Sequence, residues 1–141
     1  MKIYIASDHA GYELKAPLID YITSLNHQIV DLGPATNETV DYPDYAKAVC
    51  EKIQPNGDGD IGILICGSGQ GMAIAANRFP HIRAALCFNT EMATLARAHN
   101  HANILTMGAR QISLNDSKHV IDSFLKTSFE KRHEKRIKKL N

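Results

Sequence analysis

Five short apolar segments recur along this chain of 141 residues, and a segment of helical length separates each from the next. Apolar residues in the intervening segments return every three or four positions, as at Leu14, Leu18 and Ile22, which is the spacing of a helix with one buried face. Strands that alternate with helices are joined by right-handed crossovers, which give a parallel sheet with helices on both faces. The sequence therefore predicts one α/β domain over residues 1–141, with three layers (α/β/α) around a five-stranded parallel, Rossmann-like sheet.

Caps and turn residues set the expected boundaries of these elements. Strands are predicted over residues 2–6, 28–32, 61–65, 83–87 and 104–107. Helices are predicted over 12–25, from a cap at Asp41 to about 53, over 72–77, over 90–99 after a cap at Asn89 or Thr90, and over about 114–126. The residues QPNGDGD at 54–60 are expected to form a turn, and the basic segment 129–140 is expected to add a helix.

The third predicted strand ends in a glycine-rich turn that is the clearest sign of a binding site. The turn reads GSGQG over 67–71 and precedes a helix of small residues. Backbone N–H groups in such a turn converge at the positive end of a helix, which suits an anion. The turn is neither G-x-G-x-x-G nor a P-loop with its lysine, so we expect it to hold partial negative charge, not a nucleoside triphosphate. Tight backbone geometry without function is the alternative.

Cys66, between this strand and the turn, has two interpretations. Most buried cysteines are small core residues. The carboxyl end of a strand is where open α/β sheets bind ligands, and a nearby helix N-terminus favours a thiolate. These two features predict a reactive base or nucleophile at Cys66, while Cys50 and Cys87 are assigned to the core.

Polar residues at other strand ends should lie at the same sheet edge as Cys66. Asp8 and His9 follow the first strand, and the segments 88–90 and 108–110 follow the fourth and fifth. A turn-capping aspartate beside a solvated histidine is the alternative for the first pair. His99 and His101 end a helix, but no third metal ligand is evident, so no metal site is expected.

The C-terminal segment 126–141 is strongly basic. Its seven Lys and Arg against two Glu give it a charge of +5, which leaves −4 for the rest of a chain whose net charge is +1. Arg132 and Arg136 are four residues apart and would share a helix face, where two guanidinium groups can grip a phosphate. A solvated basic face is the alternative. Phe129 is the only aromatic residue in this segment, and acids interrupt the bases, so nucleic acid is not an expected partner.

Three features bear on the cellular context. No apolar run approaches the length of a membrane helix, so no membrane partner is expected. The three cysteines are odd in number and lack zinc-type spacing, which indicates reduced thiols. With no secretory signal evident, the expected location is the cytoplasm.

Taken in one order, these motifs closely resemble the ribose-5-phosphate isomerase B family, which includes allose-6-phosphate and galactose-6-phosphate isomerases. The resemblance covers the chain to about residue 137. It rests on SDHAG at 7–11, DYP at 41–43, ICGSGQG at 65–71, AANR at 75–78, RAHN at 97–100, and the Arg132 and Arg136 pair.

The resemblance implies a metal-free, cofactor-free isomerisation of ribose 5-phosphate to ribulose 5-phosphate through a cis-enediol, a step of the non-oxidative pentose phosphate pathway. Carried over by position, Cys66 resembles the base that moves a proton between C2 and C1, and His99 the group that opens the furanose ring. Ser68 and the amides of 67–71 resemble a cradle for the enediolate. The implied catalytic residues are Cys66, His99 and Ser68, and the implied substrate-binding residues are Asp8, His9, Gly67, Gly69, Gln70, Gly71, Asn100, Arg110, Arg132 and Arg136.

Within that set, Asp8 and Asn100 would hold sugar oxygens. His9 and the two C-terminal arginines would hold the phosphate, and Arg110 would make a further substrate contact. Some relatives use as base a glutamate just after the glycine turn, where this chain has Met72, so Cys66 must serve here. Ser68 stands where other relatives have threonine.

The family also implies a homodimer, or a dimer of dimers, with each pocket completed across the interface. Two alternatives to a ribose 5-phosphate isomerase stay open from sequence. One is an isomerase of a six-carbon sugar phosphate, allose 6-phosphate or galactose 6-phosphate. The other is a non-catalytic sensor of a sugar phosphate or nucleotide.

Overall fold

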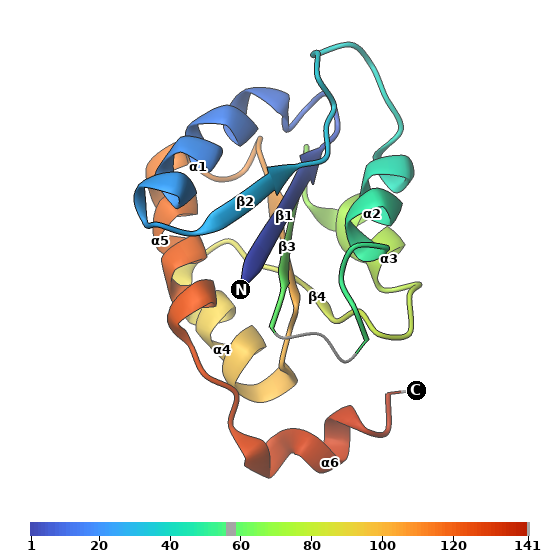
Figure 1. Ribbon diagram of the computed structural model, residues 1–141, viewed down its shortest axis with the longest axis vertical. Coiled ribbons are helices and arrows are strands. Elements are labelled where there is room, and N and C mark those ends of the chain that lie inside the picture. Colours follow the sequence, from blue (N-terminus) through green and yellow to red (C-terminus); the bar gives the residue numbers. More distant parts are fainter. Residues whose placement is uncertain (56–58, 141) are drawn as a thin grey trace.

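The computed structural model describes residues 1–55 and 59–140, and a five-stranded sheet lies at its centre (Figure 1). Every strand pair is parallel, and the strand order is β2-β1-β3-β5-β4. The strands are β1 (Lys2–Ser7), β2 (Gln28–Asp31), β3 (Ile61–Cys66), β4 (Ala84–Leu86) and β5 (Ile104–Gly108). The predicted five-stranded parallel sheet is thus confirmed. Residues 56–58 of the expected turn at 54–60 lie outside the described residues.

Helices cover both faces of the sheet, as predicted (Figure 1). On one face lie α1 (Tyr12–Ser24), α4 (Thr90–Asn100) and α5 (Leu114–Lys126), and on the other α2 (Tyr42–Cys50) and α3 (Gln70–Ala76). Each side has its own apolar core: Ile63 of β3 belongs to the first and Leu64, the next residue, to the second. Because both faces are covered, all six residues of β3 are buried. This burial fixes the strand from which the glycine turn starts.

Helix starts agree with the expected caps in one case and only partly in another. The side chain of Asn89 accepts a hydrogen bond from the N–H of Met92 at 2.9 Å and so caps α4. Asp41 occupies the N-cap position of α2, but its side chain makes no capping hydrogen bond. The helix α2 also ends at Cys50, earlier than the expected 53.

Two predictions about the site elements need correction. The helix α3 starts at Gln70, not at 72, so the last two residues of the GSGQG motif form its first turn. β4 lies beyond β5 at the sheet margin, so the residues that follow it are displaced from Cys66. Phe88 and Thr90 line a separate cleft with His119 of α5. The carboxyl ends of β1, β3, β4 and β5 thus share one edge, as predicted, but the residues that follow β4 line a different cleft from the one with Cys66.

The basic C-terminal segment forms two short helices, η1 (Lys131–His133) and α6 (Glu134–Ile137), at the end of the molecule opposite the carboxyl edge of β1 (Figure 1). Neither buries a residue. Arg132 and Arg136 thus come from consecutive short helices and not from one continuous helix. Among the described residues, no helix combines the length and apolarity needed to cross a membrane.

Candidate active site

A cleft of about 350 Å³ opens at the carboxyl edge of the sheet, where β1, β3 and β5 end. Its volume falls within the range of small-molecule sites in proteins. It is lined by Asp8, Tyr42, Cys66, Gly67, Ser68, Gly71, Arg110 and Gln111. All but Tyr42 and Gln111 are among the predicted site residues, and the structure brings them together as their shared position at strand ends requires.

The thiol of Cys66 lies against main-chain donors of the glycine turn. Cys66 ends β3, is only 5% exposed and still lines the cleft. The N–H of Gly69 donates a hydrogen bond to Sγ at 3.2 Å, and the N–H of Gln70 lies 3.4 Å from Oγ of Ser68. Gly69 has φ of +76°, and a side chain there would collide with Leu86. The turn therefore requires glycine, and its geometry directs a main-chain N–H at the sulfur.

The other two cysteines lie in a different environment. Cys50 and Cys87 are almost fully buried, and burial raises the pKa of each thiol to about 12. Both therefore remain thiols near neutral pH, as the assignment to the core predicts. All three cysteines are free. Of the three, only Cys66 lines the cleft at the carboxyl edge.

Asp8 caps the turn that follows β1 and also lines the cleft. Its Oδ1 accepts hydrogen bonds from the N–H groups of Ala10 at 2.9 Å and Gly11 at 3.1 Å, which is the work of a turn-capping aspartate. The residue is 7% exposed and also lines the cleft. His9 lies beside it, with Nδ1 3.3 Å from both N and O of Val40, in the loop before α2.

Arg110 supplies a positive charge next to the glycine turn. The main-chain N–H of Arg110 donates a hydrogen bond to the carbonyl of Gly67 at 3.0 Å. A Cβ at Gly67 would come within 2.7 Å of Nη1 of Arg110, so glycine leaves the space that the guanidinium fills. The cleft thus holds a carboxylate, a thiol and a guanidinium around one turn.

Two residues of the cleft were missed by sequence reasoning. Tyr42 is the first residue of α2, and the motif DYP marks it only as part of a helix start. Gln111 directly follows Arg110, and no motif in the sequence marks it as a site residue. Adjacency to a strand-end arginine was the available signal for Gln111.

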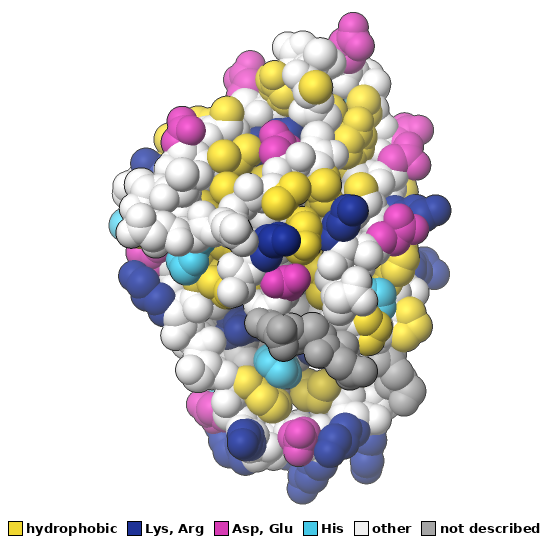
Figure 2. Space-filling model, viewed as in Figure 1, with side chains coloured by type: hydrophobic (Ala, Val, Ile, Leu, Met, Phe, Trp, Pro, Cys, Tyr) yellow, Lys and Arg dark blue, Asp and Glu magenta, His cyan; other side chains and the backbone are white. Residues whose placement is uncertain are grey.

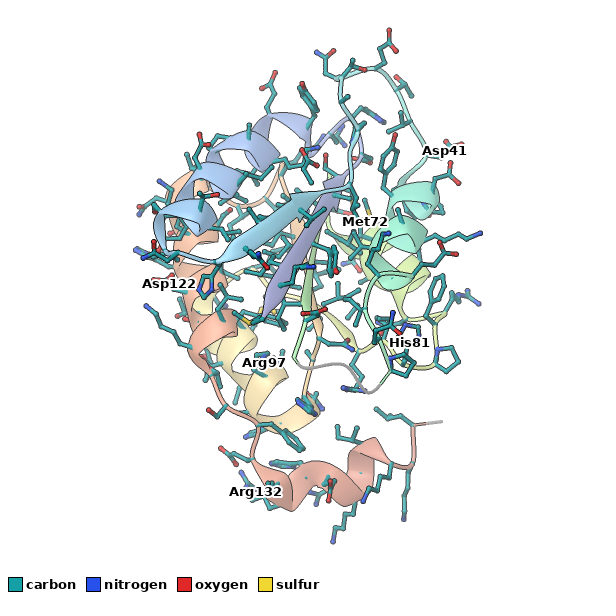
Figure 3. The ribbon with its side chains drawn as sticks, viewed as in Figure 1. Asp41, Met72, His81, Arg97, Asp122 and Arg132 are labelled. Carbon is teal, nitrogen blue, oxygen red and sulfur yellow. The ribbon has the colours of Figure 1, made fainter. Side chains whose placement is uncertain are left out.

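The remaining predicted residues lie at the opposite end of the molecule. The helix α4 starts after β4 and runs back against the strand direction, so His99 and Asn100 end up near the C-terminal segment (Figure 1). Figure 3 places Arg132 far from Asp41 and Met72. Asn100 lines another cleft with Arg83 and Leu140. Met72 is fully buried, so the position that bears the base in some relatives is part of the core here.

Five side chains form what we call the histidine–arginine cluster: His99, Glu130, Arg132, His133 and Arg136. The rings of His99 and His133 have centroids 4.5 Å apart and are tilted by 36°. Nη1 of Arg136 lies 3.2 Å from Nδ1 of His133, and Arg132 pairs with Glu130 at 2.6 Å. Figure 2 shows Lys and Arg side chains gathered at this end.

The histidine–arginine cluster also places two potential metal ligands beside His99, namely Glu130 and His133, whereas the sequence pattern pairs His99 with His101. Ligand atoms of His99, Glu130 and His133 lie within 4.8 Å of one another. However, the Glu130 carboxylate already forms an ion pair with Arg132, and Nη1 of Arg136 lies against Nδ1 of His133. Two guanidinium groups make these surroundings positive, which favours an anion such as phosphate over a cation.

The predicted site therefore exists in one chain as two separate halves. The cleft at the carboxyl edge holds the thiol, the glycine turn, Asp8 and Arg110. The histidine–arginine cluster, with Asn100 nearby, holds the ring-opening and phosphate residues that the resemblance implies.

Comparison with known proteins finds relatives that match nearly the whole chain, including both halves of the predicted site. The model of a family described as Ribose/Galactose Isomerase matches residues 3–140. A putative sugar phosphate isomerase of Rickettsia conorii is 50% identical over 139 residues, which cover 98% of this chain and 96% of that protein.

Solved structures show the same fold over the whole chain. The crystal structure of a ribose 5-phosphate isomerase from Thermotoga maritima superimposes with a TM-score of 0.94 at 50% identity, and covers 99% of this chain and 96% of that one. Ribose-5-phosphate isomerase B from Mycoplasma genitalium, solved with bound ribulose-5-phosphate, gives a TM-score of 0.94 at 40% identity and covers 99% and 93%.

Proposed function

The chain belongs to the ribose/galactose isomerase family, and from this premise we propose that it interconverts ribose 5-phosphate and ribulose 5-phosphate. The observation that carries the proposal is the hydrogen bond from the N–H of Gly69 to Sγ of Cys66, in a cleft that also holds Asp8 and Arg110. A thiol held in this way is suited to take and return a proton at carbon.

In the proposed reaction, the Cys66 thiolate removes the proton from C2 of the open-chain aldose. The electron pair moves onto O1, and donors of the glycine turn, with the hydroxyl of Ser68, stabilise the resulting cis-enediolate. A proton then passes from O2 to O1, and the Cys66 thiol returns its proton to C1. The aldehyde at C1 has become an alcohol and C2 a ketone, with no net change in atoms or electrons.

The histidine–arginine cluster supplies the other two requirements of this reaction. Ribose 5-phosphate is mainly a closed furanose, so a group such as His99 is needed to open the ring. Arg132 and Arg136 provide charge-assisted donors for the phosphate. Binding energy from the distant phosphate then holds the reacting carbons over Cys66.

We further propose that the enzyme is a homodimer in which the histidine–arginine cluster of one subunit closes the cleft of the other. The separation of the two halves within a single chain supports this arrangement. So does the lack of any buried residue in η1 and α6, because helices this short gain their stability from packing against other surfaces. A two-fold interface would generate two equivalent sites.

We place the second subunit against an exposed apolar groove. It lies between α2 and α3, and its lining includes Tyr42, Pro43, Ile74 and Phe79. Ile74 is 58% exposed, and Tyr42 lines both this groove and the cleft with Cys66. A second subunit bound in this groove would also lie next to the cleft, because Tyr42 belongs to both. Because Cys66 must work as a thiolate, we place the enzyme in the reducing cytoplasm.

The test is a coupled assay that compares kcat/KM for ribose 5-phosphate, allose 6-phosphate and galactose 6-phosphate. We expect ribose 5-phosphate to be turned over with the highest kcat/KM. A higher value for either six-carbon substrate would assign the enzyme to that sugar, and binding of all three without turnover would indicate a sensor.

A further inference from the structure

The ring of His99 packs against the ring of His133 in the histidine–arginine cluster. Within residues 1–55 and 59–140, its ring makes no hydrogen bond, and its ring contact is with His133 at 4.5 Å between centroids. A group that moves protons must be held in reach of the atoms that it serves, and small misplacements cost large factors in rate. The side chain that holds His99 is therefore part of the machinery for ring opening.

His133 is in turn fixed by Arg136. Nη1 of Arg136 lies 3.2 Å from Nδ1 of His133, and because arginine can only donate, Nδ1 must be the unprotonated acceptor. The ring proton then resides on Nε2, which is 3.8 Å from Oε2 of Glu130. His133 is only 12% exposed, and its Nε2 has no hydrogen-bond partner among the described residues.

The charges around His133 favour this neutral form. Burial, followed by the positive charges of Arg132, His99 and Arg136, lowers the pKa of His133, with Glu130 acting in the opposite direction. A neutral ring keeps the Nδ1 lone pair available to Arg136. It also spares the His99 contact the repulsion between two imidazolium ions.

We propose that His133 is a positioning residue that holds the His99 ring for furanose opening and links it to the phosphate-binding Arg136. The inference rests on the proposed function, because it takes His99 as the ring-opening group. It adds a residue whose ring lies between Arg136, the proposed phosphate-binding group, and His99, the proposed ring-opening group.

The experiment isolates ring opening from isomerisation. In a Cys66→Ala background no proton can leave C2, but an enzyme that opens the furanose still accelerates exchange between the α and β anomers of ribose 5-phosphate. Exchange is measured by NMR at saturating substrate, with and without protein. We expect clear acceleration by the Cys66→Ala protein and its loss when His99→Asn is added.

Adding His133→Ala should lower the accelerated exchange by about tenfold to a hundredfold, because His99 loses its support. His133→Phe keeps a ring beside His99 and should restore part of the rate. His133→Asn keeps an acceptor for Arg136 but no ring, and should be as slow as alanine. With Cys66 intact, the same His133→Asn change should leave the KM for ribose 5-phosphate within about twofold of the wild type. Lys135→Ala, an exposed neighbour on α6, serves as the matched control and should change nothing.

Two results would overturn the inference, and they differ from each other. If His133→Ala leaves the exchange rate unchanged while His99→Asn abolishes the acceleration, His133 has no positioning role and the proposed function stays intact. No acceleration by the Cys66→Ala protein itself would remove ring opening from His99, and the role of His133 with it.

Discussion

The cleft with Cys66 and the histidine–arginine cluster are built in opposite ways. The cleft grows out of a strand whose six residues are all buried, and its donors are main-chain groups fixed by that strand. The cluster consists of His99 at the end of α4, Glu130, and side chains of two short helices that bury no residue, held mainly by contacts with one another. The half that we propose makes and breaks C–H bonds is thus part of the core, whereas the half that we propose binds and opens the sugar is carried on the surface.

This difference indicates how the functional groups of each half are held in position. Proton transfer at carbon needs a donor array that does not move, and a covered parallel sheet provides one. The residues that we propose bind the phosphate are surface side chains, which would become ordered against the partner in the proposed dimer. The comparison predicts that changes in the first half act on kcat or on folding. In the second half, changes to Arg132 and Arg136 should act mainly on KM, and changes to His99 and His133 should act on ring opening.

The largest effect is expected at Cys66. Cys66→Ala should lower kcat by about 10³-fold or more, because a positioned base is lost, while the unfolding midpoint stays nearly unchanged. Steady-state kinetics and thermal unfolding measure the two quantities. Cys87→Ala is the matched control: it removes a sulfur whose pKa burial has raised to about 12, and it should keep near-normal turnover. Near-normal rates for Cys66→Ala would refute its role as base.

A heterodimer tests whether the two halves meet across an interface. Subunits carrying Cys66→Ala and His99→Asn are co-expressed with different tags and purified through both. One of the two sites in this heterodimer combines an intact Cys66 with an intact His99, so about half of the wild-type activity should return, well above either parent. If both residues of a site came from one chain, both sites would be damaged and no recovery would be seen.

Arg136→Ala should act mainly on substrate binding. Loss of a charge-assisted bond to phosphate is expected to raise KM by about tenfold to a hundredfold. Any fall in kcat would report the contact of Arg136 with His133. Lys135→Ala, next in sequence and exposed, controls for the general loss of positive charge. An unchanged KM in Arg136→Ala would exclude this arginine from the phosphate site.

The smallest expected effect is on stability. Comparing Gly69→Ala with Gly59→Ala distinguishes backbone strain at a positive φ from steric crowding of the added Cβ. Gly69→Ala should lower the free energy of unfolding by about 2–3 kcal/mol, because alanine at φ of +76° is strained and its Cβ would collide with Leu86. Gly59 has a similar φ of +83°, and no atom of the described residues lies within 4 Å of where its Cβ would be. Gly59→Ala should therefore cost only about 1 kcal/mol. Chemical denaturation measures both, and equal losses would show that crowding at Gly69 is unimportant.

Much of the fold could be predicted from the sequence because it is encoded locally. Periodic apolar residues, caps such as Asn89 and turn glycines define the elements, and the right-handed crossover rule orients the strands. The strand order could not be predicted, because β4 pairs with β5 through a register between Ala84 and Ile104 that no local pattern specifies. The helix start at Gln70 was missed because two glycines around it look like loop.

Site residues that lie at neighbouring strand ends could be predicted from the sequence. Site residues that only the packing of distant segments brings together were harder to predict. Asp8, Cys66 and Arg110 each lie at or just after the end of a strand, so topology alone brings them together. Glu130 and His133 carried no motif, and their relation to His99 arises because the segment after α5 passes the end of α4, where the N–H of Glu130 donates to the carbonyl of Ala98. Tyr42 lies at a helix start whose approach to the cleft depends on how α2 packs.

The order of the strands has a consequence for how the chain behaves when crowded. The two outer strands of the sheet, β2 and β4, have only four and three residues. Such brief margins offer few unpaired main-chain groups to a foreign strand, so they resist growth of the sheet into an aggregate. Copies of this protein should therefore meet through side chains, and concentrated solutions should yield discrete oligomers in place of fibrils.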